Sequence, residues 1–415
     1  MNITDLKDCP KILLTVLFLS TMLLLTHSEV PAANGAGYVN PIPPGVVVPA
    51  PTTFHTYDSL VAELLQLNTS RPDIVTIQTI GTTYENRSIM ALRLTLPGSE
   101  SKKNILYMGL HHAEEWQSME VVMYLIHYYL ANAQDLPMVR AILQNANLWF
   151  IPLVNPDGLT YSQIHDSLWR KNRRDNGDGT FGVDLNRNYG YEWNTGGFAN
   201  DGSLVNSQSI EYPGSSPFSE LETQAVRDFA IANPPVFSIS YHTAGEWILF
   251  PWSYTPSSTT DDGVFRAYSQ EMAAFNGYKI LQEGHSNHNK PGNADDWLYN
   301  QFGTLAFTYE VGPGFSSQDE QRIESIVQSN VQSAVFGASL SLHLTPLSCA
   351  PRLLLCVPSL SIVSLAIPGL AGAVFFGVRM QQRRANRLNR EDPDGENHET
   401  DLVDSGPALR APIES

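Results

Sequence analysis

Residues 105–118 read "ILYMGLHHAEEWQS", where an apolar run leads into paired histidines and paired glutamates and then into a helical pattern. The apolar run predicts a buried strand over 105–109, and the residues after the polar cluster predict a helix over 118–131. Runs of strand length and longer helical patterns alternate along the middle of the chain. The other predicted strands are 148–154, 236–241 and 305–310, and the other predicted helices are 59–67, 219–232 and 262–275. This alternation indicates an α/β domain with a largely buried central sheet.

The composition narrows the classes of function. The chain has 415 residues and a formal net charge of −17, which argues against a general nucleic-acid-binding protein because such proteins carry a basic face. Its three cysteines are Cys9, Cys349 and Cys356, so residues 10–348 hold neither a disulfide framework nor a thiolate metal site. Any metal bound by this stretch must use His, Asp or Glu.

The N-terminal region suggests export. Residues 12–25 form an apolar run behind Lys7 and Lys11, which suits a signal peptide over 1–28, with an uncleaved N-terminal anchor as the alternative. Residues 29–52 are rich in Pro, Ala, Gly and Val and indicate a linker.

The C-terminal region suggests a membrane anchor. Residues 353–378 contain no charged residue, and their length predicts a transmembrane helix rather than a buried core helix. Five arginines follow within 379–390, and residues 391–415 are acidic and poor in aromatic side chains. We therefore expect a cytoplasmic basic flank and a disordered acidic tail over 379–415. Together the two ends predict a single-pass protein of the cell membrane whose middle region lies outside the cell.

The paired histidines and glutamates offer two candidate pairs of metal ligands. His111 with Glu114 and His112 with Glu115 share a spacing of three, and either pair can face one ion from a tight turn or helix start. His242, at the end of a predicted strand, offers a third ligand, and three protein ligands are usual for catalytic zinc. Spacing alone does not choose between the pairs.

Eight short motifs occur in order between residues 111 and 312. They are HHAEEW, IPLVNPDGL, LWRKNRR, VDLNRNYGYEW, YPGSSPFSELET, SYHTAGEWILFPW, DDWLY and FTYEVG. The series resembles the zinc metallocarboxypeptidases of the carboxypeptidase A, B and T type. This resemblance implies a single catalytic domain over 53–345, built on a mixed, twisted sheet flanked by helices, that removes C-terminal residues from peptides.

The resemblance also implies which residues bind zinc. Counting back from the tryptophan of HHAEEW, the family pattern assigns one zinc ion to His112, Glu115 and His242. It gives Asp184 the role of orienting the first zinc histidine, since a carboxylate behind a ligand fixes the tautomer of its ring. His111 is then expected to be a polar residue near the site that does not bind the ion.

The catalytic and substrate-binding residues follow from the same resemblance. Glu310, at the end of a predicted strand, matches the general base and acid, and Arg170 matches the arginine that stabilises negative charge on the carbonyl oxygen. Asn186 and Arg187 match the pair that binds the C-terminal carboxylate, a task for which the planar guanidinium is suited.

Some positions depart from the family pattern or refine it. His288 stands where members usually place a mobile tyrosine over the bound carboxylate, and Glu114 replaces an arginine that many members carry. Asp295 stands at the expected base of the specificity pocket, where a carboxylate favours a C-terminal Lys or Arg. Lys290 lies on the same loop and offers an alternative partner for Asp295.

Residues 175–179, "DNGDG", have the oxygen-rich look of a calcium loop between Asp175 and Asp178. Their spacing is too short for an EF-hand, so a solvated glycine turn is the favoured interpretation.

Two other functions stay open at this stage. A zinc enzyme of the same fold could act as an amidase or peptidase on cell-wall peptides. A non-catalytic member could bind peptides without cutting them, although such a member is expected to lose a zinc ligand or the catalytic glutamate.

Overall fold

The computed structural model describes residues 48–195, 205–285, 289–314 and 319–344. The predicted signal peptide or anchor over 1–28, the transmembrane helix over 353–378, the tail over 379–415 and His288 lie outside this part of the chain. Within it, no helix is long and apolar enough to span a membrane.

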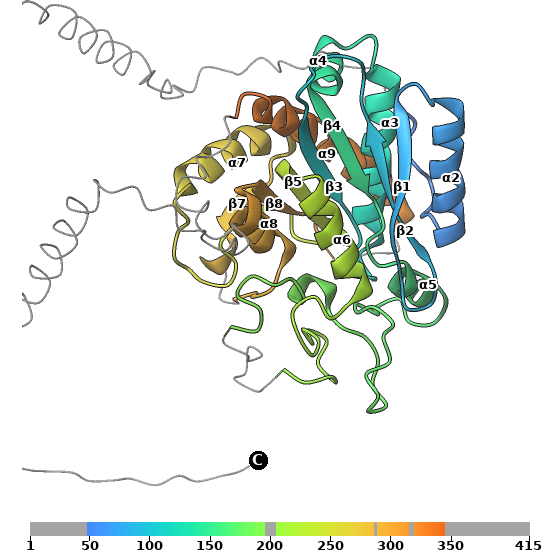
Figure 1. Cartoon of the computed structure of the whole chain (residues 1–415), viewed down its shortest axis with the longest axis vertical. Helices are drawn as coiled ribbons and strands as arrows, with labels where there is room; N and C mark the ends of the chain where they lie inside the picture. The colour runs from blue at the N-terminus through green and yellow to red at the C-terminus, as the bar shows by residue number, and fades with distance from the viewer. Residues whose placement is uncertain (1–47, 196–204, 286–288, 315–318, 345–415) are drawn as a thin grey trace, which may run out of the picture. The chain divides into compact units, whose positions relative to one another are not determined.

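Eight strands of the described part form one mixed sheet (Figure 1), in the order β1-β2-β4-β3-β5-β8-β6-β7. They are β1 (Val75–Thr82), β2 (Ser88–Leu94), β3 (Lys103–Met108), β4 (Ala146–Ile151), β5 (Pro235–His242), β6 (Trp247–Phe250), β7 (Lys279–Gln282) and β8 (Leu305–Glu310). The inner strands β4, β3, β5 and β8 run parallel to their neighbours in this row. The outer pairings β1–β2, β2–β4 and β8–β6 are antiparallel.

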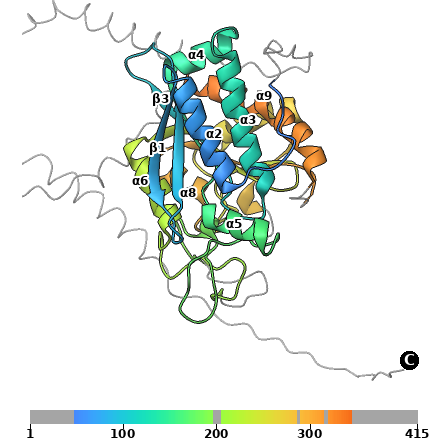
Figure 2. The same cartoon turned by 90° about the vertical axis from the view of Figure 1, so that its right-hand side faces the viewer.

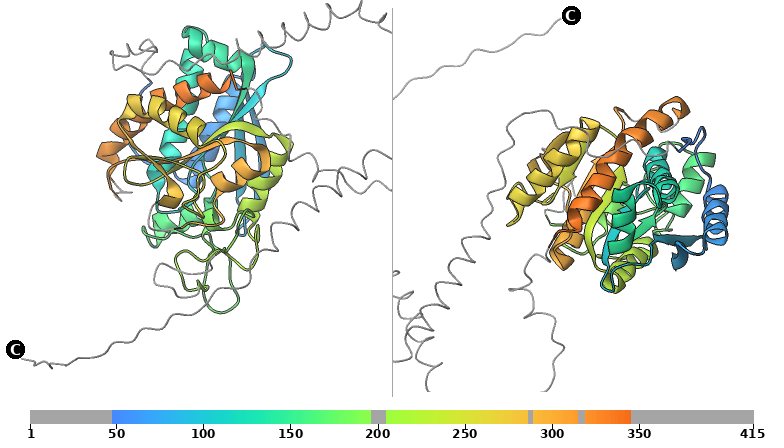
Figure 3. Two further views of the ribbon diagram at one scale, coloured as in Figure 1. Left: turned by 90° about the vertical axis from the view of Figure 1, so that its left-hand side faces the viewer. Right: turned by 90° about the horizontal axis from the view of Figure 1, so that it is seen from above.

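Helices cover both faces of the sheet. They are α2 (Tyr57–Ser70), α3 (Trp116–Asn132), α4 (Pro137–Asn145), α5 (Pro156–Ile164), α6 (Leu221–Ala232), α7 (Asp262–Asn276), α8 (Ala294–Phe302) and α9 (Ile323–Ser341), with short 3₁₀ turns η1 (Leu185–Arg187), η2 (Glu283–His285) and η3 (Glu320–Arg322). Figures 1 and 2 show α6 on one side of the sheet and α2, α3 and α9 on the other, and Figure 3 shows the same layers from two further directions.

The alternation of side chains along the inner strands creates a core on each face. On β3, Ile105 and Tyr107 join the larger core, to which α2, α3, α7 and α9 contribute. Leu106 and Met108 point the other way, into a smaller core with α6 and α8. Because successive side chains of a strand face opposite sides, a strand buried on both faces is apolar throughout. This is why residues 105–108 of β3 were visible in the sequence as a continuous apolar run.

All four predicted strands and all four predicted helices are present, with ends that shift by a few residues, and β8 has the predicted bounds 305–310. The prediction of an α/β domain with a mixed sheet flanked by helices is therefore confirmed. The elements that were not predicted are β1, β2, β6, β7, α4, α5, α8 and α9. Strands β6 and β7 have four residues each, too few for a clear pattern.

Candidate metal centre and cleft

The sheet gathers the candidate residues at one edge. Strands β3, β5 and β8 are adjacent and parallel, so their carboxyl ends lie together. His242 is the last residue of β5 and Glu310 the last residue of β8, and the two are direct register partners. His112 and Glu115 occupy the connection between β3 and α3. Open α/β sheets commonly bind ligands at this place, where strand order reverses.

A tight turn after β3 places the first two candidate ligands. A side chain at Gly109 would bring its Cβ to 2.9 Å from two carbonyl oxygens, those of Pro152 and Ser118, so only glycine fits. Leu110 follows with a positive φ of 50°, and its N–H donates to Ser118 Oγ at 3.0 Å. Ser118 Oγ in turn donates to the carbonyl oxygen of Glu115. These bonds tie the turn to the first residues of α3.

Three buried side chains converge on one point. His112 Nδ1 lies 2.9 Å from one oxygen of Glu115, and His242 Nδ1 lies 2.9 Å from the other. The two Nδ1 atoms are 3.0 Å apart. In the described part of the chain, one group of three or more His, Cys, Asp or Glu side chains has its ligand atoms close together, namely His112, Glu115 and His242. Their ligand atoms all lie within 4.8 Å of one another.

The donor set fits zinc. Ligand atoms about 2.0–2.1 Å from a tetrahedral ion lie roughly 3.3 Å from one another, so a small expansion of the present contacts would admit the ion. Two imidazole nitrogens and one carboxylate oxygen are a ligand set of catalytic zinc, and such a site leaves the fourth position for water or substrate.

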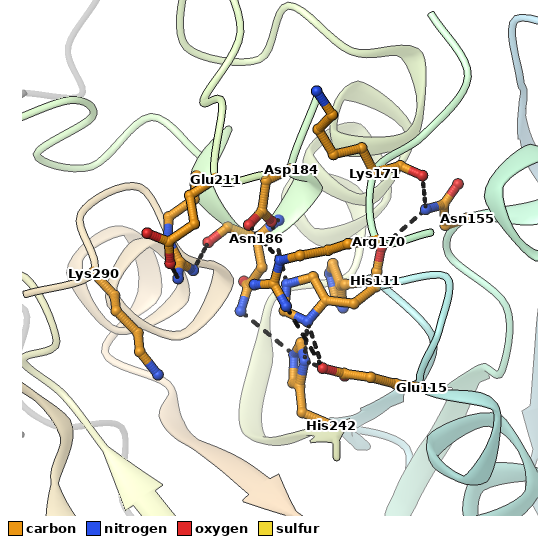
Figure 4. A network of polar contacts seen from close by, with 12 residues as sticks. His111, Glu115, Asn155, Arg170, Lys171, Asp184, Asn186, Glu211, His242 and Lys290 are labelled. Carbon is orange, nitrogen blue, oxygen red and sulfur yellow. Dashed lines mark hydrogen bonds and ion pairs between the residues drawn. The ribbon is translucent and has the colours of Figure 1, made fainter. Parts of the chain in front are cut away.

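Asp184 and Arg170, which lie close together in Figure 4, complete the surroundings of His112. Asp184 is fully buried just before η1, and its Oδ1 lies 3.2 Å from His112 Nε2, the ring nitrogen that faces away from the cluster. Its Oδ2 accepts from Arg170 Nε at 2.9 Å. The backbone carbonyl of Arg170 also accepts from the N–H of Ala113. The same carboxylate therefore orients a candidate ligand and the candidate oxyanion-binding arginine.

His111 lies beside the cluster without joining it. Its Nε2 is 2.8 Å from the Tyr189 hydroxyl, and its ring stacks on His242 with centroids 5.5 Å apart. Burial is the main reason that the pKa of His111 lies well below its usual value, so the ring is neutral. Of the two pairs that the spacing left open, the structure joins His112 and Glu115 to His242.

Glu310 lies at the edge of a cleft of about 810 Å³. Burial, followed by the charge of Glu115, raises the pKa of Glu310 to about 7, while Lys290 acts in the opposite direction. The cleft is also lined by the three candidate metal ligands and by Glu114, Arg170, Asn186, Arg187, Glu211, Glu283, Lys290 and Thr308. The pKa of a general base is best placed near the working pH, and Glu310 meets this condition.

The two candidate carboxylate-binding residues line the same cleft but already have internal partners. The side chain of Asn186 has its Nδ2 3.4 Å from His242 Nε2, and its Oδ1 accepts from the N–H of Ala294. Arg187 Nη2 donates to Glu211 Oε1 at 2.8 Å. Glu211 was not singled out from the sequence, where only its place just before the motif YPGSSPFSELET distinguishes it.

The candidate specificity pocket contains charges of both signs. Asp295 is buried in the first turn of α8, behind Thr308, and does not itself line the cleft. One of its oxygens accepts from the Thr308 hydroxyl, and the other has no hydrogen-bond partner among the described residues. Burial raises the pKa of Asp295 well above its usual value. Lys290 pairs with Glu283 at 2.9 Å, not with Asp295 as the sequence alternative allowed. Asn293 Nδ2 donates to the second oxygen of Glu283 at 3.2 Å.

The loop at 175–179 has the features of a glycine turn. Asp175 Oδ1 accepts from the N–H of Gly177, and Asp178 Oδ1 accepts from the N–H and hydroxyl of Thr180. Both glycines of the loop, Gly177 and Gly179, have positive φ angles. The carboxylates therefore serve the turn itself, and the calcium alternative has no support in these contacts.

A buried His-Glu-His cluster, open to a cleft that is also lined by Arg170 and by Glu310 with its raised pKa, is the arrangement of a zinc-dependent hydrolase. The particular family follows from comparison with known proteins. Residues 60–333 match the family model described as zinc carboxypeptidase. This chain therefore belongs to the zinc carboxypeptidase family of peptide hydrolases.

Individual relatives agree with this assignment. Carboxypeptidase B from Astacus astacus is 31% identical over 272 residues, which cover 63% of this chain and 86% of that protein. The crystal structure of thrombin activatable fibrinolysis inhibitor matches with a TM-score of 0.67 at 25% identity, covering 71% of this chain and 76% of that one. A protein named inactive metallocarboxypeptidase ecm14, from Talaromyces marneffei, is 32% identical over 199 residues, 45% of this chain and 33% of that protein.

Proposed function

We propose that this chain is a zinc-dependent carboxypeptidase that removes C-terminal residues from peptides outside the cell, with a preference for Lys or Arg. The observation that carries the proposal is a shared cleft. The buried cluster of His112, Glu115 and His242 opens into the same space as Glu310 and Arg187.

The side chains around the cluster can carry out peptide hydrolysis. A zinc ion held there would polarise the scissile carbonyl and lower the pKa of water toward 7. Glu310 would take the proton of the attacking water and pass it to the nitrogen of the departing amine. Arg170, fixed by Asp184, would neutralise the negative charge that develops on the carbonyl oxygen.

Recognition of a free carboxylate would make the enzyme an exopeptidase. Arg187 and Asn186 line the cleft on η1, close to the candidate metal ligands. A guanidinium can hold a carboxylate through two parallel hydrogen bonds. With the terminal carboxylate held there, the last peptide bond of a substrate would reach the zinc ligands and Glu310.

Preference for Lys or Arg rests on the carboxylates of the pocket. Among the described residues, Asp295 has a buried oxygen without a hydrogen-bond partner, and its other oxygen accepts from the hydroxyl of Thr308, which lines the cleft together with Glu283. A cationic side chain would provide the positive charge that keeps Asp295 ionised, whereas an apolar guest would leave it buried and unpaired. Among peptides that differ only in the C-terminal residue, we expect a higher kcat/KM for those ending in Arg or Lys than for those ending in Phe or Leu.

This preference predicts the behaviour of Asp295→Ile. The ratio of kcat/KM for a peptide ending in Arg to that for one ending in Phe should fall by at least ~30-fold, because a buried charge pair loses one partner. Glu283→Gln serves as the matched variant and shows whether the outer carboxylate sets the preference instead. A wild type that prefers Phe, or an unchanged ratio in Asp295→Ile, would refute this role of Asp295.

Assays with ordinary peptides and with cell-wall stem peptides distinguish this proposal from two alternative functions. An amidase or peptidase for cell-wall peptides would cleave a muramyl-type stem peptide and leave ordinary C-terminal peptides intact. A non-catalytic relative would bind peptides without turnover. The presence of all three candidate ligands and of Glu310 favours an active enzyme.

Action outside the cell is supported by the sequence of the two ends. The apolar runs 12–25 and 353–378 and the arginines after the second run suit export followed by anchoring, with the C-terminus in the cytoplasm. Protease added to intact cells should remove the catalytic domain and leave a tag at the C-terminus protected. Deleting 353–378 should release active protein into the medium, while deleting 391–415 should not. A domain protected in intact cells would refute the proposal.

A further inference from the structure

The guanidinium that is proposed to bind the substrate carboxylate already holds a carboxylate of the protein. Arg187 Nη1 donates to the backbone oxygen of Asn186 at 3.0 Å, and Nη2 donates to Glu211 Oε1 at 2.8 Å. Each terminal nitrogen therefore uses one of its two N–H groups within the protein, and Nη2 is directed at the carboxylate of Glu211. A carboxylate arriving from a peptide meets a cation that already has an anionic partner.

Glu211 is placed to exchange with a ligand. Both Arg187 and Glu211 line the cleft, but the side chain of Arg187 is 8% exposed, whereas that of Glu211 is 35% exposed. Glu211 lies on the connection between η1 and α6, outside any helix or strand. The charge of Arg187 is the main cause of the lowered pKa of Glu211, so this side chain is an anion at neutral pH. The arginine is held by the fold, and its partner can turn toward water.

We propose that Glu211 is an internal competitor for the carboxylate-binding site, and that the C-terminal carboxylate of a peptide binds Arg187 by displacing it. This inference rests on the proposed carboxypeptidase function and names a residue that sets substrate affinity. Two carboxylates beside one guanidinium repel each other, so we expect the pair Arg187–Glu211 to open when the substrate carboxylate binds. The free energy of that pair is subtracted from the binding of every peptide with a free C-terminus.

The test is the substitution Glu211→Gln, which removes the negative charge and keeps the shape of the side chain. In Glu211→Gln, KM for peptides with a free C-terminus should fall roughly three- to tenfold, as expected for a partly exposed, charge-assisted hydrogen bond. The effect should lie in KM and not in kcat. The inhibition constant of the free amino acid product should fall by the same factor, and that of its amide, which lacks the carboxylate, should not change.

Two controls isolate the contact. Asp262→Asn removes the carboxylate of a 2.8 Å ion pair with Arg266 on α7, away from the cleft, and should leave KM unchanged. In an Arg187→Gln background, Glu211→Gln should give no further gain. Glu211→Ala provides a second variant and should lower KM in the same direction as Glu211→Gln.

Several outcomes would overturn the proposal. An unchanged or raised KM in Glu211→Gln, with native thermal stability, would show that Glu211 supports substrate binding or only braces its loop. An equal change for the amino acid and its amide would show that the effect does not pass through the carboxylate. If the wild type hydrolyses no peptide, the proposed function fails separately. Calorimetric titration of the zinc-loaded protein with amino acid and amide still decides the role of Glu211.

Discussion

His112→Ala should lose the zinc ion and all measurable peptide hydrolysis, whereas His111→Ala should keep the ion. His112 Nδ1 faces Glu115 and His242 within 3.0 Å, while His111 contacts the Tyr189 hydroxyl instead. Removing one of three protein ligands leaves two, too few to hold a catalytic zinc ion against dialysis. Metal analysis of the dialysed proteins, together with hydrolysis of a peptide before and after chelation, provides the measurement.

The two histidines form a matched pair, because both are buried and both touch His242. Loss of packing alone would therefore affect both variants, and thermal unfolding of each protein reports that cost. Zinc retained in His112→Ala and lost in His111→Ala would contradict the assignment. Activity that survives complete removal of the metal would contradict zinc dependence itself.

Glu310→Gln should lower kcat by a factor on the order of 10²–10⁴, the usual contribution of a general base, with zinc content and KM nearly unchanged. The amide has the shape of the carboxyl group but cannot accept the proton of the attacking water. Burial and the charge of Glu115 already raise the pKa of Glu310 to about 7, so this carboxylate binds a proton readily near neutral pH. Steady-state kinetics on one good peptide substrate would measure the change.

A second variant separates proton transfer from fold effects. Glu310→Asp keeps the carboxylate but shortens its reach from the end of β8, so it should retain more activity than Glu310→Gln. A near-normal rate in Glu310→Gln would show that another group is the base. Glu114, which lines the same cleft, would then be the next residue to replace.

The sequence determined the inner part of the sheet. Strands β3, β4, β5 and β8 are largely buried on both faces, so they appear as mainly apolar runs whose ends can be located, although Ser238 and Ser240 interrupt the run in β5. His242 and Glu310 stand at such ends, where parallel neighbours bring their carboxyl ends together. The family resemblance carried by the motifs then favoured His112 over His111, a choice that spacing left open. The sequence could not fix β6 and β7, because four-residue strands carry no clear period.

Local sequence patterns do not show which side chains form ion pairs between loops. Those pairs became known only from the tertiary structure. Arg187 pairs with Glu211, which stands 24 residues further along in a segment without regular structure. Lys290 pairs with Glu283 and leaves Asp295 to the Thr308 hydroxyl, although the sequence allowed Lys290 to reach Asp295. Periodicity encodes which face of a helix or strand is buried, because that face repeats. Ion pairs between irregular segments depend on the paths of both backbones, which arise only when the whole sheet and its connections have folded.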